Sequence, residues 1–418
     1  MEVMYDVSAG IDVHRDTVVV SIRKRTEHGR EVVETRTFAT FHDSLLEMAA
    51  WLEEHEVPIV GLESTGVYWK PVVRVMQLRS RKQVIWLVNP AEVKKVPGRK
   101  TDVTDSQWLS KLVMHGLVSP SFLPGLELEE LRKLTRFRTK LVSEQSSYKN
   151  RLLKELESSG IKLASVCSDV FGKSGRAMLA ALLEGKRTPA EIADLAVGAL
   201  RSKIPTLERA VSGSFSGATQ FVLKQILERM DQLQRDLASI DEQIQQRLQR
   251  YAPDVERLRS VPGLDHITIA AILAEAGPDM SVFRGAEQLA AWSGLSPGSN
   301  ESAGKHKAAP TRKGDKYLRT ALVQAAWSAV RTRGAFWAQK FRQLIVRLGP
   351  KKTIVAIARR MLVAVFYMLR DSTPYRPPAP ATPTPDKTKR LVRRLTAQIE
   401  ALGFRVTLES AGVAAPAT

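Results

Sequence analysis

The chain has 418 residues, of which 44% are hydrophobic and 26% charged, and this composition excludes an intrinsically disordered protein. Its 63 Lys and Arg against 44 Asp and Glu give a formal net charge of +19, and residues 303–394 alone hold 22 of the basic and three of the acidic side chains. The whole excess therefore lies in one stretch, which predicts a polyanionic partner, most simply nucleic acid.

Several protein classes are excluded by simple features of the sequence. The longest apolar run near the C-terminus, residues 361–369, is far shorter than the ~20 residues that a membrane-spanning helix needs. The first residues lack the basic and apolar regions of a secretory signal. The single cysteine, Cys167, can form neither an internal disulfide nor a metal cluster. We therefore expect a cytoplasmic protein with no membrane partner.

Residues 1–118 are predicted to form an α/β domain. Strands are expected at 9–13 and 18–22, as a hairpin, and at 58–62 and 83–88, because these runs are rich in β-branched and apolar residues. Helices are expected at 45–52 and 72–76 from their apolar spacing. The alternation of strand and helix predicts a mixed or parallel sheet covered by helices.

Four acids of this domain form a candidate metal site. Asp12 lies inside a strand-like run and Glu63 ends a second apolar strand, whereas Asp102 and Asp105 lie where a helix would begin, on one helical face. Oxygen ligands in that number suit Mg²⁺ or Mn²⁺, and a two-metal arrangement would stabilise the attacking and leaving oxygens at a phosphate. Taken alone, Asp102 or Asp105 also fits an ordinary role as a helix cap and Glu63 one as a turn residue, whereas an acid in mid-strand, as Asp12 is, has no simple structural explanation. Asp16 is interpreted as a solvated turn acid, and His14 as a surface side chain or one that supports a ligand, rather than as a ligand itself.

Residues 119–257 are predicted to form a long helical linker and oligomerisation region. Apolar residues recur at steps of three and four over 226–251, which is a heptad seam, and a weaker pattern covers 131–156. Two long helices could pair as a hairpin within one chain or join two protomers as a coiled coil. The narrow seam favours the coiled coil. Its positions are Ile226, Met230, Leu233, Leu237, Ile240, Ile244, Leu248 and Tyr251.

Residues 258–371 are predicted to form a basic, all-α domain with a helix-hairpin-helix. The run Val261-Pro262-Gly263 is a tight turn between two helical segments, and such a turn offers N–H groups to a DNA phosphate. The alternative is a helical corner without a ligand. Residues 372–418 form a Pro-rich and charged tail, with a linker followed by a short charged helix at about 387–402.

A loop of small residues in this domain carries serines and is flanked by cations. A hydroxyl placed there could attack a phosphodiester while the cations hold its charge. The alternative is an ordinary loop whose cations only touch backbone phosphates, and chemistry alone does not choose among Ser296, Ser299 and Ser302. The residues predicted to contact nucleic acid are Lys305, Lys307, Arg312, Lys313, Lys316, Arg319 and Gly263.

Six motifs occur in an order that resembles the DEDD transposases of the insertion sequence 110 group, relatives of the pilin gene invertases. The resemblance covers about residues 1–370, in two blocks joined by the helical region. The motifs are Gly10-Ile11-Asp12-Val13, Gly61-Leu62-Glu63-Ser64-Thr65-Gly66, Asp102 with Asp105, Val261-Pro262-Gly263, Leu295-Ser296-Pro297, and Ser302-Ala303-Gly304-Lys305 with Arg312-Lys313-Gly314.

The resemblance implies an N-terminal domain with an RNase H-like fold, similar to the RuvC resolvase, in which the acidic tetrad binds Mg²⁺. By motif position the tetrad is Asp12, Glu63, Asp102 and Asp105, and the serine nucleophile of the C-terminal transposase domain is Ser302. It also implies site-specific DNA recombination, in some members guided by a structured noncoding RNA. It further implies dimers to tetramers whose composite active sites combine two protomers.

The sequence therefore predicts a DNA transposase or site-specific recombinase that cuts and rejoins the DNA of a mobile element. Two alternatives remain open. One is a metal-dependent nuclease of the Holliday-junction type that cleaves with water and uses no serine. The other is a non-catalytic architectural protein that binds DNA through the turn and the coiled coil.

Overall fold

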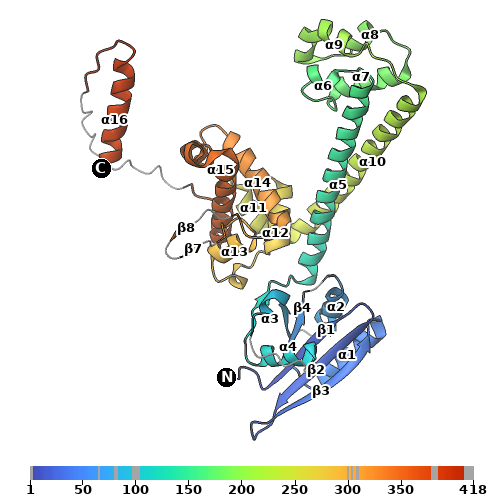
Figure 1. Ribbon diagram of the computed structural model, residues 1–418, viewed down its shortest axis with the longest axis vertical. Helices are drawn as coiled ribbons and strands as arrows, with labels where there is room; N and C mark the ends of the chain where they lie inside the picture. The colour runs from blue at the N-terminus through green and yellow to red at the C-terminus, as the bar shows by residue number, and fades with distance from the viewer. Residues whose placement is uncertain are drawn as a thin grey trace.

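The computed structural model describes residues 3–64, 66–79, 83–96, 104–298, 301–302, 305–306, 310–377 and 385–408. It contains an α/β domain, a pair of long helices that carries a group of short helices at its far end, and a C-terminal domain of packed helices (Figure 1). No helix of this described part has the length and apolar character needed to cross a membrane.

The α/β domain is built on a mixed six-stranded sheet in the order β3-β2-β1-β4-β5-β6. Strands β3, β2 and β1 are antiparallel, whereas β1, β4 and β5 are parallel. The mixed sheet and its first hairpin were predicted, but β3 was not, because its mostly exposed side chains show no apolar alternation. The strands are β1 (Val7–Val13), β2 (Thr17–Arg25), β3 (Glu31–Ala39), β4 (Ile59–Glu63), β5 (Val84–Val88) and β6 (Pro120–Ser121).

Helices cover both faces of this sheet. Ala9, Ile11, Val60 and Leu62 belong to a core shared with the buried side chains of α1 and α2. The alternate residues of β1 and β4 face α4, since side chains along a strand alternate between the two faces. The helices of the domain are α1 (His42–Glu54), α2 (Trp69–Arg79), α3 (Pro90–Val93) and α4 (Asp105–Met114).

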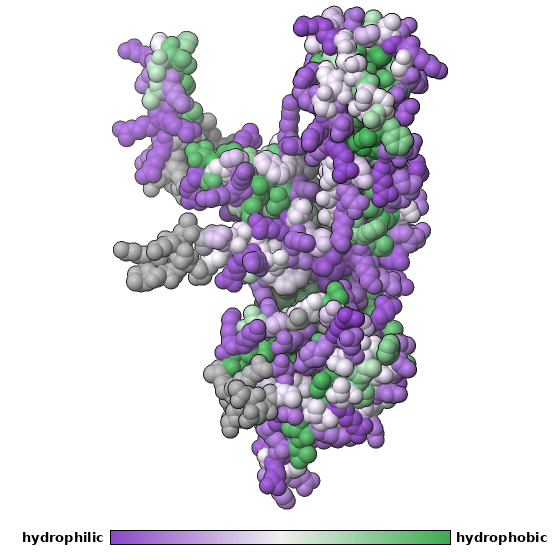
Figure 2. Space-filling model, turned by 45° about the vertical axis from the view of Figure 1, so that its right-hand side comes forward, coloured by the Kyte–Doolittle hydropathy of each residue, from purple (hydrophilic) through white to green (hydrophobic). Residues whose placement is uncertain are grey.

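The two long helices, α5 (Leu126–Ser158) and α10 (Gly217–Leu248), pack against each other within one chain. Leu141 of α5 meets Leu233 and Leu237 of α10, so much of the predicted heptad seam is buried inside the monomer. At the far end, short helices that the sequence did not predict form their own core. They are α6 (Leu163–Val166), α7 (Lys173–Glu184), α8 (Pro189–Ala193), η1 (Gly198–Lys203) and α9 (Ile204–Ala210). Hydrophilic side chains predominate on the visible surface of the long pair (Figure 2).

The C-terminal domain is helical, as predicted, except for a small two-stranded sheet of β7 (Glu301–Ser302) and β8 (Lys305–His306). Its core also includes the near ends of the long pair, through Leu131, Ile244 and Leu248. The second long helix of this domain, α15, is broken at Gly349, where Pro350 begins a new helical segment. The elements are η2 (Gln249–Tyr251), α11 (Ala252–Arg259), α12 (His266–Ala276), η3 (Met280–Val282), α13 (Ala286–Trp292), α14 (Lys316–Arg331), α15 (Phe336–Arg370) and, beyond the proline-rich linker, α16 (Pro385–Glu400).

Candidate active site

Two of the predicted acids lie side by side at one edge of the sheet. Ile11 of β1 pairs with Leu62 of β4 in parallel register, and Asp12 and Glu63 are the next residue of each strand. Residues in register on adjacent parallel strands face the same side of the sheet. Asp12 and Glu63 are therefore neighbours at the carboxyl ends of β1 and β4, on the face that α4 covers.

The helix α4 lies unusually close to this face. A Cβ atom on Gly10 would be 2.1 Å from the carbonyl oxygen of Ser106 and 2.4 Å from the amide nitrogen of Ser110. A Cβ on Gly61 would be 2.4 Å from a methyl group of Val113. Gly10 leaves room for the helix backbone against β1, and Gly61 leaves room for the Val113 side chain against β4, so the two glycines determine where α4 sits.

The direction of α4 brings its first residue to the acidic edge. Ser8, near the start of β1, donates a hydrogen bond of 3.0 Å to the carbonyl of Ser110, and Gly10, two residues on, lies against the preceding turn of the helix. Helix α4 therefore runs antiparallel to β1, and its N-terminus points toward Asp12. Asp105 is the first residue of α4.

The immediate surroundings of Asp12 distinguish it from the neighbouring acid. The Asp12 side chain is 29% exposed, and its Oδ2 lies 3.1 Å from Nε2 of His14, which is 59% exposed. Asp16 is 78% exposed and pairs with Arg15 at the surface, as expected for a solvated turn acid. His14 is therefore placed to hold the Asp12 carboxylate by a hydrogen bond, which is the supporting role that the sequence left open for it.

The acids that converge here supply oxygen donors of the kind that Mg²⁺ and Mn²⁺ prefer. Glu63 is half-buried and Asp105 is exposed at the helix end. The fourth predicted ligand, Asp102, lies outside the described residues. Among the residues that are described, no three His, Cys, Asp or Glu side chains gather closely enough to hold a metal ion. The donor chemistry thus fits a divalent cation, and the metal site itself stays a prediction.

A buried polar network locks α4 onto the sheet, and the sequence did not predict it. Ser21 of β2 is hydrogen-bonded to Ser106 at 2.8 Å, and Arg23 donates to Ser110 Oγ at 3.3 Å and to the carbonyl of Gln107 at 3.1 Å. Each of these serines is fully buried. Two serines one helical turn apart, opposite a strand that contains glycine, were the sequence feature from which this network could have been predicted.

Ser302 lies on a β-hairpin that extends from the C-terminal domain (Figure 1). In the hairpin Ser302 pairs with Lys305, and the base is closed by a bridge between Pro297 and Thr311. The side chains at 302 and 305 lie outside the described part of the chain, as does Lys307 entirely. The predicted nucleophile is thus on a short paired strand, rather than in an irregular loop.

The base of the hairpin is tightly packed. A Cβ on Gly314 would lie 2.3 Å from the amide nitrogen of Gly294, so the two ends of the hairpin segment touch backbone to backbone. Asp315 follows directly, and its amide donates to the carbonyl of Trp292 at 3.0 Å. Its carboxylate caps α14 by accepting a 2.7 Å hydrogen bond from the amide of Leu318. The hairpin therefore starts and ends at fixed points.

A buried ionic network connects this base to α5. Glu275 is 1% exposed and accepts two 2.7 Å hydrogen bonds from Arg136, which also contacts Asp315 at 3.2 Å. Arg132 contacts the same carboxylate at 3.1 Å. Burial raises the pKa of the Glu275 carboxyl, and the hydrogen bonds from Arg136 oppose that rise. The network fixes the orientation of α5 relative to the hairpin.

Comparison with known proteins agrees with this arrangement of two functional regions. A family model described as a transposase, of the DEDD IS110 type, matches residues 9–160, and one described as "Transposase IS116/IS110/IS902 family" matches residues 255–342. Together the two matches span more than half of the chain. The chain belongs to the IS110 family of transposases.

Several curated proteins are similar to this transposase. A "Probable family 20 transposase" of Pseudomonas aeruginosa is 24% identical over 326 residues, which cover 76% of this chain and 86% of the relative. The "Transposase for insertion sequence element IS1111A" of Coxiella burnetii is 23% identical over 301 residues, or 69% of this chain and 72% of the relative. A 42 kDa protein of insertion element IS900 from Mycobacterium paratuberculosis is 28% identical over 212 residues, covering 50% of this chain and 51% of the relative.

The predicted phosphate-binding turn of the transposase has a packing role in the structure. Gly263 has a φ of +93°, and a Cβ there would lie 2.6 Å from the carbonyl oxygen of Ala325, so the turn rests directly on α14. The N-terminus of the following helix, α12, is capped by Asp265, which accepts a 2.7 Å hydrogen bond from the amide of Thr268. These contacts favour the alternative interpretation of the turn as a helical corner without a ligand. A phosphate contact at Gly263 stays a prediction.

The other predicted nucleic-acid contacts lie beside the hairpin. Arg312, Lys313 and Lys316 are exposed and Arg319 is partly buried, all between the hairpin base and the first turns of α14. Within one transposase chain these cations and the hairpin belong to the C-terminal domain, whereas the acids belong to the α/β domain (Figure 1). The two regions of the predicted site are therefore carried by separate bodies of the protein.

Proposed function

We propose that this transposase cuts and rejoins the DNA of a mobile element at specific sites, with an acidic metal-binding set in the α/β domain and Ser302 as nucleophile. The observation that carries the proposal is the convergence of Asp12, Glu63 and the N-terminus of α4, which begins at Asp105, at one edge of the sheet. A rigid strand edge and a helix held by backbone contacts are a suitable support for ligands that must not shift during reaction.

The strand order supports a RuvC-like, RNase H-like reading of the domain. Three antiparallel strands are followed by two parallel ones, with Asp12 on the central strand β1. Asp12, Glu63, Asp102 and Asp105 would hold Mg²⁺ or Mn²⁺. When bound, such a cation supplies positive charge to a phosphate that is being attacked. His14 would orient the Asp12 carboxylate toward that cation.

The serine step leaves the number of phosphoester bonds unchanged. Oγ of Ser302 attacks the phosphorus of a DNA phosphodiester and forms a phosphoserine ester, while the bond to the 3′ oxygen breaks and this oxygen leaves as a 3′ hydroxyl. The 3′ hydroxyl of another strand then attacks the ester, which rejoins the DNA and returns the serine. The energy of the phosphodiester is kept in the covalent intermediate, so no external energy source is needed.

Basic side chains beside the hairpin would hold the nucleic acid. Arg312, Lys313, Lys316 and Arg319, with Lys305 and Lys307, would contact phosphates, so we expect affinity to fall steeply as salt rises. We also propose a structured guide RNA as partner and an assembly of two to four protomers. Sequencing of the nucleic acid that copurifies with the protein tests whether a guide RNA is bound. The absence of any enriched structured RNA from the flanking element would count against it.

Trapping the covalent intermediate tests the nucleophile. With a nicked substrate that prevents rejoining, the wild-type protein should accumulate a protein–DNA adduct, Ser302→Ala should give none, and the matched variants Ser296→Ala and Ser299→Ala should retain it. If Ser302→Ala cleaves DNA without an adduct, the protein is instead a metal-dependent nuclease. If the wild type binds but never cleaves, the architectural role is favoured.

Amide substitutions test the acidic set. Asp12→Asn and Glu63→Gln should each lower strand cleavage by at least about a hundredfold, since each removes a charged donor at the reacting phosphate. The matched control is Asp16→Asn, because Asp16 is a nearby acid that faces solvent. Equal activity of Asp12→Asn and Asp16→Asn would refute the metal site. DNA binding measured without metal should be the same for all three proteins.

A further inference from the structure

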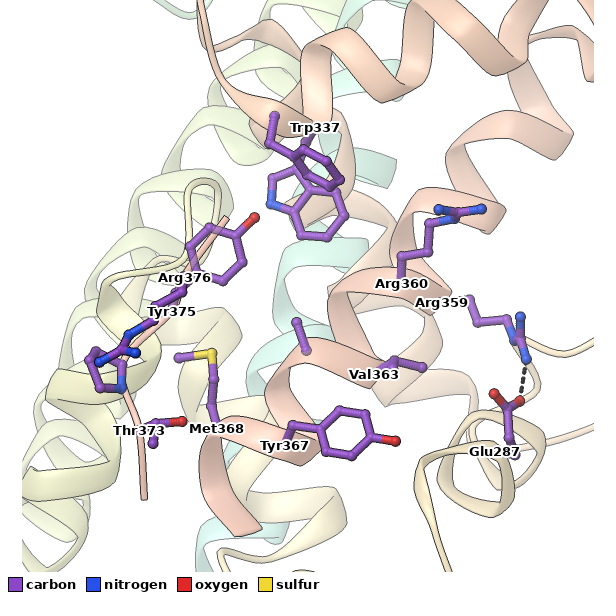
Figure 3. Close-up of a pocket in the computed structure, with 13 residues that line it drawn as sticks. Glu287, Trp337, Arg359, Arg360, Val363, Tyr367, Met368, Thr373, Tyr375 and Arg376 are labelled. Atoms are coloured by element: carbon purple, nitrogen blue, oxygen red, sulfur yellow. Dashed lines mark hydrogen bonds and ion pairs between the residues drawn. The ribbon is translucent and has the colours of Figure 1, made fainter. Parts of the chain in front are cut away.

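The C-terminal domain contains a pocket of about 510 Å³ that no role assigned above uses. It lies between the last half of α15 and the segment 373–376 that follows this helix (Figure 3). Its lining combines aromatic rings with guanidinium groups, and the acid in it, Glu287, is paired with Arg359. The residues that carry the argument are Trp337, Tyr367, Tyr375, Arg359, Arg360 and Arg376.

One wall of the pocket is a fixed aromatic surface. The Trp337 side chain is 3% exposed, and its ring stacks on Tyr375 with 6.0 Å between ring centroids and 26° between planes. The segment that carries Tyr375 is held in place, because the Tyr375 amide donates to Ser260 Oγ at 3.0 Å and the Thr373 amide donates to the carbonyl of Met368 at 3.1 Å. The wall is therefore formed before any ligand arrives.

The pocket residues also carry buried polar atoms that lack partners. Of the nine such side-chain atoms found among the described residues, three belong here: Trp337 Nε1, Tyr375 Oη and Arg359 Nε. A buried donor that is left unpaired costs about 1–3 kcal/mol, so the packing around this pocket is not optimal for the chain alone. Burial raises the pKa of Tyr375 to about 12, so its hydroxyl stays protonated and can donate at neutral pH.

The charge at the pocket is positive. Arg360 and Arg376 are exposed at its lining, and Tyr367, 44% exposed, carries Arg370 over its ring at 4.7 Å. A flat aromatic surface and exposed guanidinium groups match two parts of a nucleotide. These are the face of the base and the phosphate.

We propose that this pocket binds an unpaired nucleotide of a single strand, with its base against the Tyr375 and Trp337 wall and its phosphate at Arg360 and Arg376. A base in a duplex is already stacked and paired on its edge, so it could not make these contacts. The inference rests on the proposed function only in taking nucleic acid as the partner. It concerns a site separate from the acids and from Ser302.

Equilibrium binding to full-length protein tests the pocket. The probes are labelled single strands of about ten nucleotides, as RNA and as DNA of the same sequence, and a DNA duplex. Tyr375→Leu should weaken binding of at least one single strand about tenfold and binding of the duplex less than twofold, since one stacked base is worth about that much. Loss confined to RNA or to DNA identifies the source of the nucleotide.

Matched variants keep the test independent of folding and of catalysis. Phe221→Leu removes an exposed aromatic ring on α10, and Arg347→Ala removes an exposed cation elsewhere on α15; neither should change single-strand affinity, whereas Arg360→Ala should reduce it. The same measurements in the Ser302→Ala background should give the same ratios even if the serine mechanism is wrong.

A photoactivatable thio-base in the single strand provides a second measurement that needs no pocket variant. It should crosslink to the wild-type peptide that contains Trp337 or Tyr375. Crosslinking only at other peptides, or equal weakening of single-strand and duplex binding by Tyr375→Leu, would overturn the proposal.

Discussion

Replacing Gly10 with alanine should displace α4 and separate Asp105 from Asp12. The new Cβ would lie 2.1 Å from the carbonyl oxygen of Ser106, where a normal contact needs more than 3.4 Å. The obstructing atoms are backbone atoms of the helix, so no side-chain rotation can relieve the clash. The helix must move away from the sheet by about 1 Å, given the usual separation of nonbonded atoms.

The expected cost follows from the kind of atom that is in the way. Overpacking of a core costs about 1–3 kcal/mol, and a rigid backbone neighbour places Gly10→Ala in the upper half of that range. A Cβ on Gly61 meets one methyl group of the Val113 side chain rather than the helix backbone, so Gly61→Ala should cost less than Gly10→Ala. Gly217→Ala is the control, because no atom lies within 4 Å of a Cβ there.

Hydrogen exchange of the α4 amides reads out this local displacement. A loss of about 2 kcal/mol corresponds to about thirtyfold faster exchange limited by opening of the helix. Strand cleavage should follow the ranking of these costs. The cleavage rate should fall most for Gly10→Ala, less for Gly61→Ala, and stay unchanged for Gly217→Ala. If Gly10→Ala exchanges and cleaves like Gly217→Ala, then α4 is not seated on Gly10 as we argue, and the convergence of the acids fails with it.

Two further predictions concern the helical regions. Glu275→Leu leaves Arg132 and Arg136 without their buried partner and should destabilise α12 by about 3 kcal/mol in hydrogen exchange. The control is Glu256→Leu, which removes an exposed acid and should change stability little. Adding Arg136→Met to Glu275→Leu should recover part of the lost stability. If the effects of the two substitutions simply add, the network is contradicted. Burial raises the pKa of the Cys167 thiol, so its alkylation at pH 8 should be much slower in the folded protein than in urea, and equal rates would refute its burial.

The elements that could be predicted from the sequence are those in which burial leaves a regular pattern. The strands β1, β2, β4 and β5 carry apolar runs because one or both faces are covered, and the acids stand out against these runs. The strand β3 escaped prediction because most of its side chains are exposed and none is buried. The convergence of Asp12 and Glu63 follows from parallel pairing, which sequence order suggested but did not specify.

The rest depended on contacts between residues far apart in the chain. Buried serines such as Ser21 and Ser106 look like surface residues in a sequence, and only the close approach of α4 to β1 explains them. The pocket at Tyr375 was hidden for another reason, since that residue opens a proline-rich tail interpreted as a linker. The long helices show the limit of periodicity: a heptad seam indicates that a partner exists, and here α5 of the same chain covers much of it.

The central proposal is that the acids of the α/β domain of one protomer and Ser302 of another protomer act on the same phosphate. Coexpression of Asp12→Asn with Ser302→Ala tests this most directly, because a mixed dimer has one intact site only if each site combines two protomers. Each variant alone should be inactive, and the mixture should recover about a quarter of wild-type cleavage, since half of the dimers are mixed and each holds one intact site. An inactive mixture that still assembles and binds DNA, or cleavage by either variant alone, would contradict the account.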